Sequence, residues 1–149
     1  MVSTVNVSTT DGAAGPIAPA DFRILLVDDN ADANESMAAL LEMLGYAVAT
    51  AADGPTALAV SSRFMPHLIL CDIGLPGMSG HELAGELRSA TGKRNIVLAA
   101  ATGYGLDSDR ARSRAAGFDH HLVKPLDAEA LLDFVAWQAA TYQPTRSIE

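Results

Sequence analysis

Short apolar runs alternate along this chain with segments in which apolar residues recur at helical spacing. The apolar runs are two to six residues long and comprise Ile24–Val27, Tyr46–Thr50, Leu68–Cys71, Ile96–Ala101 and Leu122–Val123. Continuous rather than alternating apolar character is typical of strands that are buried on both faces of a parallel sheet. We therefore expect five strands.

The segments between these runs predict five helices. Residues recur at helical spacing in two of them, at Met37, Leu40, Leu41 and Leu44 and at Ala57, Leu58, Ser61 and Phe64. A third helix is expected to turn Leu83, Ala84 and Leu87 inward, a fourth to span Asp107–Ala116, and the last to carry Leu131, Leu132 and Val135 on one face. Gly45, Pro66 and Gly117 are expected helix stops. Strands that alternate with helices predict an α/β fold, with a doubly wound parallel sheet covered on both faces.

The chain has 149 residues, which is room for one ordinary domain. Residues 1–21 carry few large side chains, so we expect a flexible N-terminal tail, a domain over residues 22–142 and a C-terminal tail over residues 143–149.

Charge and hydropathy exclude several classes of function. A net charge of −8 argues against nucleic-acid binding, which needs clustered Lys and Arg. No apolar run approaches the roughly 20 residues that a membrane helix requires, and the N-terminus lacks the features of a secretory signal. The single cysteine, Cys71, cannot form an internal disulfide and is expected to be a buried small hydrophobe. We expect a cytoplasmic protein with no membrane partner.

Polar residues follow directly after the expected strands. They are Asp28 and Asp29, Asp72, Thr102 and Lys124. The carboxyl ends of parallel strands meet at one edge of a sheet, where ligands bind in such folds. Three carboxylates there require raised pKa values or a cation, and one lysine cannot balance them. Carboxylates with room for water suit Mg²⁺.

The same edge offers the groups that phosphoryl transfer needs. Asp72 stands alone at the end of the central apolar strand and is the best candidate nucleophile. The Thr102 hydroxyl, the Lys124 ammonium and the Gly103 N–H are donors for phosphoryl oxygens. Asp28 and Asp29 are better suited to holding the metal.

Four sequence motifs in this order resemble the receiver domain of two-component response regulators. They are Val27–Asn30, Cys71–Gly80, Ala101–Gly103 and Leu122–Pro125, and the resemblance covers roughly Phe22 to Tyr142. It implies a flavodoxin-like (βα)5 three-layer sandwich with strand order 2-1-3-4-5.

The resemblance also implies a set of roles. Asp72 would accept a phosphoryl group from a phosphohistidine on a sensor histidine kinase or a histidine phosphotransfer protein. The Mg²⁺ ligands would be Asp28, Asp29, Asp72 and the backbone carbonyl of Gly74. Thr102 and Lys124 would contact the phosphoryl oxygens, and the Lys124–Pro125 bond would be cis.

The sequence departs from the usual receiver pattern at the switch and around the acceptor. His121 stands where most receivers have the Tyr or Phe that reorients as Thr102 moves, so an imidazole takes that role or the switch is rewired. Gly74 and Tyr104 flank the expected route of water to the acyl phosphate and would tune dephosphorylation.

Other histidines and one helix have simpler interpretations. His120 and His121 are adjacent on a strand and face opposite sides, so they cannot chelate one ion. His67 and His81 are expected at the surface. The helix over Asp107–Ala116 has only alanines as apolar residues, so its docking is expected to be weak, and we hypothesise that it moves with the His121 strand upon phosphorylation.

The preferred interpretation is a stand-alone phospho-acceptor switch that catalyses only its own phosphorylation and dephosphorylation and signals to a downstream protein. No output domain follows Tyr142, and the initiating Met1 favours a complete small protein over a piece of a hybrid kinase. A Mg²⁺-dependent phosphatase with an aspartyl nucleophile is disfavoured. Such enzymes usually carry a second acid two residues after the nucleophile as the general acid–base, and Gly74 occupies that position here. A flavin-binding protein is disfavoured because Asp28 and Asp29 would repel the phosphate. A receiver-like binding module that is never phosphorylated stays open.

Overall fold

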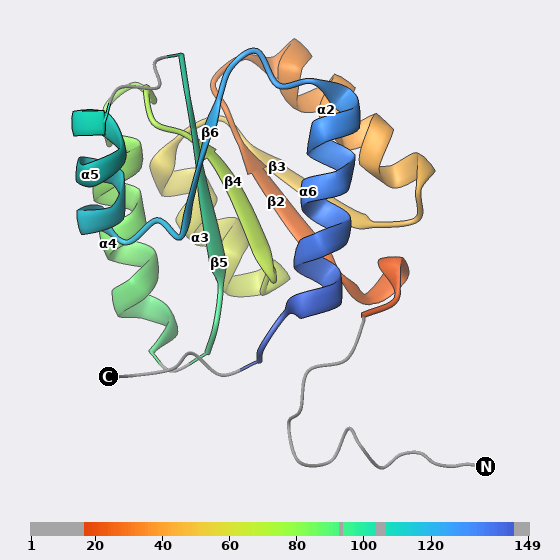
Figure 1. Ribbon diagram of the computed structural model, residues 1–149. Helices are drawn as coiled ribbons and strands as arrows, with labels where there is room; N and C mark the ends of the chain where they lie inside the picture. The colour runs from red at the N-terminus through yellow and green to blue at the C-terminus, as the bar shows by residue number, and fades with distance from the viewer. Residues whose placement is uncertain (1–16, 93, 104–106, 145–149) are drawn as a thin grey trace.

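The protein is a three-layer α/β sandwich, seen here in a computed structural model that describes residues 17–92, 94–103 and 107–144. Helices α2 and α6 cover one face of the sheet, and α3, α4 and α5 lie on the other (Figure 1). The strands are β2 (Arg23–Val27), β3 (Ala47–Ala51), β4 (Leu68–Asp72), β5 (Val97–Thr102) and β6 (His120–Val123). The helices are η1 (Pro19–Asp21, a 3-10 turn), α2 (Ala31–Met43), α3 (Gly54–Phe64), α4 (Gly80–Thr91), α5 (Asp107–Ala116) and α6 (Ala128–Thr141).

All five strands are parallel and lie in the order β3-β2-β4-β5-β6. Numbered along the chain, this is the order 2-1-3-4-5, so the expected fold class and topology are confirmed. The order reverses direction between β2 and β4, which places the carboxyl ends of these two strands side by side at the switch point of the sheet.

Each central strand is apolar on both faces because it serves two cores. Ile24 and Leu26 of β2 enter the core beneath α2 and α6, whereas Leu25 and Val27 enter the core beneath α3 and α4. All four side chains are almost completely buried. This explains why the sequence reads as a continuous apolar run rather than an alternating one.

Polar side chains define where four helices begin. Asn30, Asp53, Ser79 and Asp127 each accept a hydrogen bond from a backbone N–H in the first turn of α2, α3, α4 and α6. At α4, the carboxylate of Glu82 also accepts a hydrogen bond from the N–H of Ser79, which completes a capping box.

The ends of the chain pack differently from what the sequence suggested. Ile17, within the expected N-terminal tail, packs against the core, and its N–H donates to the carbonyl of Ala139. Leu44, expected at helical spacing with Met37 and Leu41, is instead the residue that follows α2 and is 50% exposed.

Within the described ranges, we find no helix that is both long and apolar enough to span a membrane.

His67 is a packing residue, so the expectation of a surface histidine is wrong. Its ring stacks on Phe22 with centroids 5.2 Å apart and meets Tyr142 edge-on at 4.8 Å. The Nδ1 atom accepts a hydrogen bond from the N–H of Arg23. Burial, together with the charges of Arg23 and Arg94, lowers the pKa of His67 to about 4.

This environment predicts a pH dependence of stability. His67 titrates near 6.5 in the unfolded chain and near 4 in the folded one, so the unfolded state binds the extra proton between these pH values. The stabilising contribution of the neutral ring is present above pH 6.5 and is lost as the pH falls towards 4.

The variant His67→Asn keeps an acceptor for Arg23 but cannot titrate. We expect the difference in free energy of unfolding between the wild type and His67→Asn, measured by urea denaturation, to shrink as the pH falls from 7 to 4.5. Two parallel stability curves would contradict the proton linkage.

Candidate functional site

The register of the sheet brings the acidic residues together. Val27 pairs with Cys71, so the next residues, Asp28 and Asp72, leave neighbouring strands at the same level. Thr102 pairs with Val123 in the same way, which puts Lys124 beside the end of β5. The convergence expected at this edge is therefore a consequence of strand pairing.

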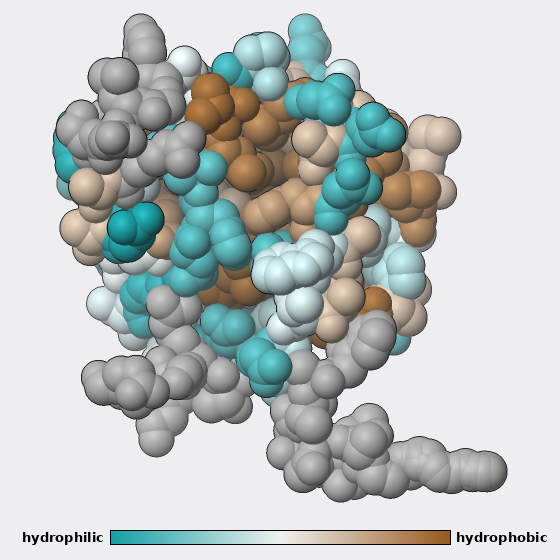
Figure 2. All heavy atoms as spheres, in the orientation of Figure 1, coloured by the Kyte–Doolittle hydropathy of each residue, from teal (hydrophilic) through white to brown (hydrophobic). Residues whose placement is uncertain are grey.

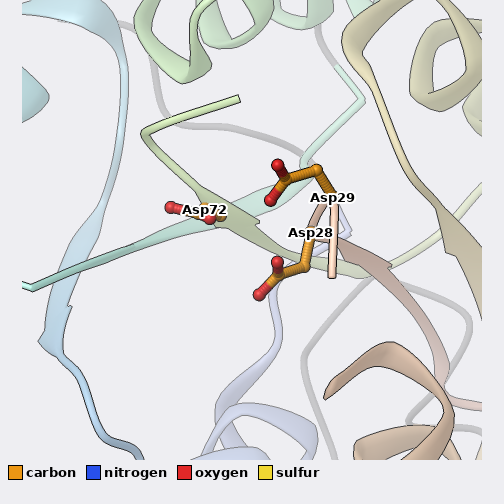
Figure 3. A group of neighbouring side chains, drawn as sticks. All are labelled: Asp28, Asp29 and Asp72. Carbon is orange, nitrogen blue, oxygen red and sulfur yellow. The ribbon is translucent and has the colours of Figure 1, made fainter. Parts of the chain in front are cut away.

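Three carboxylates form one cluster at this edge. One oxygen each from Asp28, Asp29 and Asp72 lies within 4.8 Å of the others. Figure 3 shows Asp28 and Asp29 extending from the end of β2 and Asp72 from the adjacent β4. Asp28 and Asp72 are half-buried, whereas Asp29 is exposed. Such a group of oxygens with an open side fits Mg²⁺, which keeps several waters.

Lys124 is the cation that faces the cluster. Its Nζ atom lies 3.0 Å from Oδ2 of Asp28 and 3.3 Å from Oδ2 of Asp72. Burial lowers the pKa of Lys124, but the hydrogen bond to Asp28 and the charges of Asp72 and Asp28 outweigh it, so the net shift is upward. The ammonium therefore stays charged. From the end of β6, it contacts carboxylates at the ends of both β2 and β4.

Asn34 fixes the backbone of the first acidic residue, and the sequence reasoning missed it. This buried side chain on α2 donates from Nδ2 to the carbonyl of Asp28 at 2.8 Å and to that of Ala51 at 3.2 Å. The sequence did contain a sign of this role: Asn34 lies one helical turn before Met37 and two turns before Leu41, so its amide shares the inward face of α2 with them.

The loop after β4 is held close to the start of α4. The N–H of Gly74 donates to Oδ1 of Asp72 at 3.0 Å, and the N–H of Gly80 donates to the carbonyl of Ile73. A Cβ on Gly80 would lie 2.7 Å from Cα of Ile73 and 3.0 Å from the carbonyl oxygen of Asp72. Gly80 therefore permits an approach of backbone to backbone that sets the position of Asp72.

A cleft of about 430 Å³ opens beside Asp72. Its lining residues come from the loop after β4, the start of α4, the end of β5 and α5, and they are Asp72, Ile73, Gly74, Ser79, His81, Thr102, Gly103 and Arg112. Thr102 and Gly103 thus share a cavity with Asp72, as the sequence predicted. The participation of His81 and Arg112 was not predicted.

His81 connects the two helices that form one wall of this cleft. It is half-buried, and its Nε2 atom lies 3.3 Å from Oγ of Ser113, a buried residue of α5. The expected surface position is therefore met only in part, because the ring forms part of the cleft wall. The neighbours Arg112 and Arg114 are both exposed.

Three further expectations concern His121, Tyr104 and the bond between Lys124 and Pro125. His121 is half-buried on β6, where it pairs with Ala100, and its role as a switch stays a prediction. Tyr104 lies outside the described residues. The bond between Lys124 and Pro125 is cis, as the resemblance implied.

Cys71 is chemically inert in the fold. It is buried, and burial together with the charges of Asp72 and Asp28 raises the pKa of its thiol to about 12. A thiol with so high a pKa stays protonated at neutral pH and is a poor nucleophile. The expectation of a small buried hydrophobe is confirmed.

Comparisons with known proteins agree with this arrangement. Residues 24–136 match the family model of the response regulator receiver domain. An uncharacterised 14.6 kDa protein of Leptolyngbya boryana is 31% identical over 125 residues, which cover 84% of this chain and 95% of that protein. Other curated relatives are named as response regulators or transcriptional regulators, and the chain spans only 23 to 46% of their lengths.

Solved structures show the same fold. A CheY-like receiver domain protein from Methanospirillum hungatei has a TM-score of 0.72 at 31% identity, covering 79% of this chain and 93% of that one. A response regulator protein from Burkholderia pseudomallei, solved with a phosphorylated aspartic acid, a calcium ion and citrate, has a TM-score of 0.70 at 28% identity. The match covers 80% of this chain and 69% of that one.

Two glycines of α4 provide a matched pair for testing the loop geometry. We expect Gly80→Ala to destabilise the protein by about 1–3 kcal/mol, because its Cβ meets backbone that must move. Gly85 is exposed in the middle of the same helix, and nothing lies within 4 Å of the place that a Cβ would take, so Gly85→Ala should stabilise by about 0.5–1 kcal/mol. Urea denaturation of both variants checks the pair, and equal effects would refute a special role for Gly80.

Removing the cation of Lys124 should make stability depend on a divalent ion. We expect Lys124→Gln to lower the free energy of unfolding by about 1–2 kcal/mol in EDTA, because the half-buried carboxylates lose their counter-charge. Mg²⁺ should then raise the melting temperature of this variant more than that of the wild type.

The exposed Arg63 of α3 supplies the control for the lysine substitution. Arg63→Gln removes one positive charge without touching the cluster and should leave the response to Mg²⁺ unchanged. If Mg²⁺ stabilised the wild type, Lys124→Gln and Arg63→Gln equally, the acidic cluster would not be the ion's site.

Proposed function

Because this chain belongs to the response regulator receiver domain family, we propose that it is a phospho-acceptor switch of a two-component or phosphorelay system. Asp72 is the residue that is phosphorylated. The observation that carries the proposal is the position of its carboxylate, which lies at the end of the central strand, 3.3 Å from Nζ of Lys124 and within the acidic cluster.

Asp72 acts as the nucleophile. One carboxylate oxygen attacks the phosphorus of the donor, a P–O bond to Asp72 forms, and the bond from phosphorus to the leaving group breaks with its electron pair. The other oxygen, Oδ1, accepts the hydrogen bond of the Gly74 N–H. That bond fixes the carboxylate and leaves Oδ2, which lies 3.3 Å from Nζ of Lys124, as the attacking oxygen.

The surrounding donors receive the charge of the phosphoryl group. Lys124 exchanges a contact with the Asp72 carboxylate for a contact with a phosphoryl oxygen, and the Thr102 hydroxyl and the Gly103 N–H contact the others. Asp28, Asp29, Asp72 and the Gly74 carbonyl would hold Mg²⁺, which would supply positive charge to offset the negative charge of the phosphoryl oxygens. The Burkholderia relative was solved with a phosphorylated aspartic acid and a calcium ion, which supports a phosphorylated aspartate and a divalent cation here by similarity.

The phosphoryl donor is a phosphohistidine of a sensor kinase or phosphotransfer protein, and the output is a change in protein contacts. Support for a contact surface comes from the hollow between β6 and α6, visible as brown side chains at the centre of Figure 2. Leu122, Val123, Pro125 and Phe134 line it. Helix α5 is the element best suited to move, because Ala111 and Ala115 are small and exposed and so add little buried area.

Intact mass spectrometry after incubation with acetyl phosphate tests the acceptor. We expect one added phosphoryl group on the wild type with Mg²⁺ and none in EDTA. Asp72→Asn should remain unmodified, whereas Asp133→Asn, which changes an exposed aspartate of α6, should react like the wild type. An adduct on Asp72→Asn would place the acceptor elsewhere, and no adduct in any condition would favour an unphosphorylated binding module.

A further inference from the structure

The cleft beside Asp72 is larger than a phosphoryl group requires. Its volume of about 430 Å³ falls within the roughly 300–1,000 Å³ typical of small-molecule sites. Acceptor, metal ligands and phosphoryl donors occupy the strand ends, so the part of the cleft bounded by α4 and α5 is left for the rest of the phosphodonor.

The direction of the reaction places the leaving group in that part. In-line displacement requires the leaving group to lie on the side of the phosphorus opposite the attacking oxygen of Asp72. Thr102 and Gly103, the proposed donors to the phosphoryl oxygens, line the cleft together with Asp72. The phosphorus therefore lies at the base of the cleft, and the leaving group on its far side extends into the part that α5 borders.

Among the described residues that line this cleft, Arg112 alone carries a fixed positive charge. The side chain is exposed, and among the residues that the structure describes it makes no hydrogen bond or ion pair. The hydrogen bond between His81 and Ser113 holds the adjacent turn of α5 against α4 and so positions Arg112 at the cleft. A guanidinium in this place matches a carboxylate, which it can bind through two parallel hydrogen bonds.

We propose that, among small phosphodonors that react without a kinase, Arg112 makes this receiver prefer acyl phosphates, whose leaving group is a carboxylate. The proposal rests on the proposed function, because it concerns which small donors can phosphorylate the same residue, Asp72, in place of a phosphohistidine. The Asp72 oxygen forms its bond to phosphorus, the bond between phosphorus and the acyl oxygen breaks, and the electron pair leaves on the carboxylate that Arg112 binds. No proton or further reactant is needed.

Two donors that differ in their leaving groups test the assignment. Acetyl phosphate releases an anionic acetate, whereas phosphoramidate releases ammonia, which carries its own proton away and is neutral. The rate constant for phosphorylation is measured with each donor in Mg²⁺ by intact mass spectrometry over time. The full chain is used throughout, and circular dichroism is recorded for every variant.

We expect Arg112→Ala to slow the reaction with acetyl phosphate by about tenfold, the loss typical of a hydrogen bond to a charged group, and to change the rate with phosphoramidate much less. Arg112→Lys should give an intermediate rate, because it keeps the charge and loses the two-point geometry. Arg114→Ala is the matched control, since Arg114 is exposed on the same helix but lines a different hollow with Asp119 and His120.

The outcomes separate this inference from the proposed function. If Arg112→Ala left the acetyl phosphate rate unchanged, or slowed both donors equally, the role of Arg112 at the leaving group would be wrong. The proposed phosphorylation of Asp72 would be unaffected by that result. An equal effect of Arg114→Ala would reduce the result to general charge attraction and would also overturn the assignment. Failure of the wild type with both donors would instead contradict the proposed function.

Discussion

Repulsion among three carboxylates at one edge of the sheet is the constraint around which this molecule is organised. Two carboxylates about 4 Å apart repel by roughly 4 kcal/mol at an effective dielectric constant of 20. Lys124 offsets part of this by reaching Asp28 and Asp72 together. The remaining negative charge attracts a cation, and the same charge would oppose an incoming phosphoryl group if no cation were bound. The proposed phosphorylation of Asp72 would therefore be coupled to the binding of a metal ion.

The fold makes that concentration of charge possible by anchoring its backbone elsewhere. The strands that deliver Asp28 and Asp72 are buried on both faces, and their pairing fixes the level at which each one ends. At the end of β2, the side chain of Asn34 donates a hydrogen bond to the carbonyl of Asp28. At the end of β4, the close backbone contact of Gly80 fixes the position of Asp72. The stability of the two cores therefore holds like charges together in a geometry that they would not adopt alone.

The sequence was sufficient for features that depend on chain direction and periodicity. The apolar runs predicted the strands, and the polar residues at their ends predicted the cluster, because parallel strands end at a common edge. Features that depend on side chains meeting from distant elements were out of reach. Stacking of His67 on Phe22 joins residues 45 positions apart along the chain, and the cleft wall with His81 and Arg112 needs α4 and α5 to be placed first. Leu44 was misplaced because periodicity does not mark the residue at which a helix leaves the core.

A crystal structure of the wild type grown with Mn²⁺ in place of Mg²⁺, with anomalous data at the manganese edge, is the most direct test of this organisation. We expect an anomalous peak within bonding distance of carboxylate oxygens of Asp28, Asp29 and Asp72. A crystal with saturating Mn²⁺ and no peak at these three residues would contradict the central claim, since the carboxylates would then be balanced without a metal.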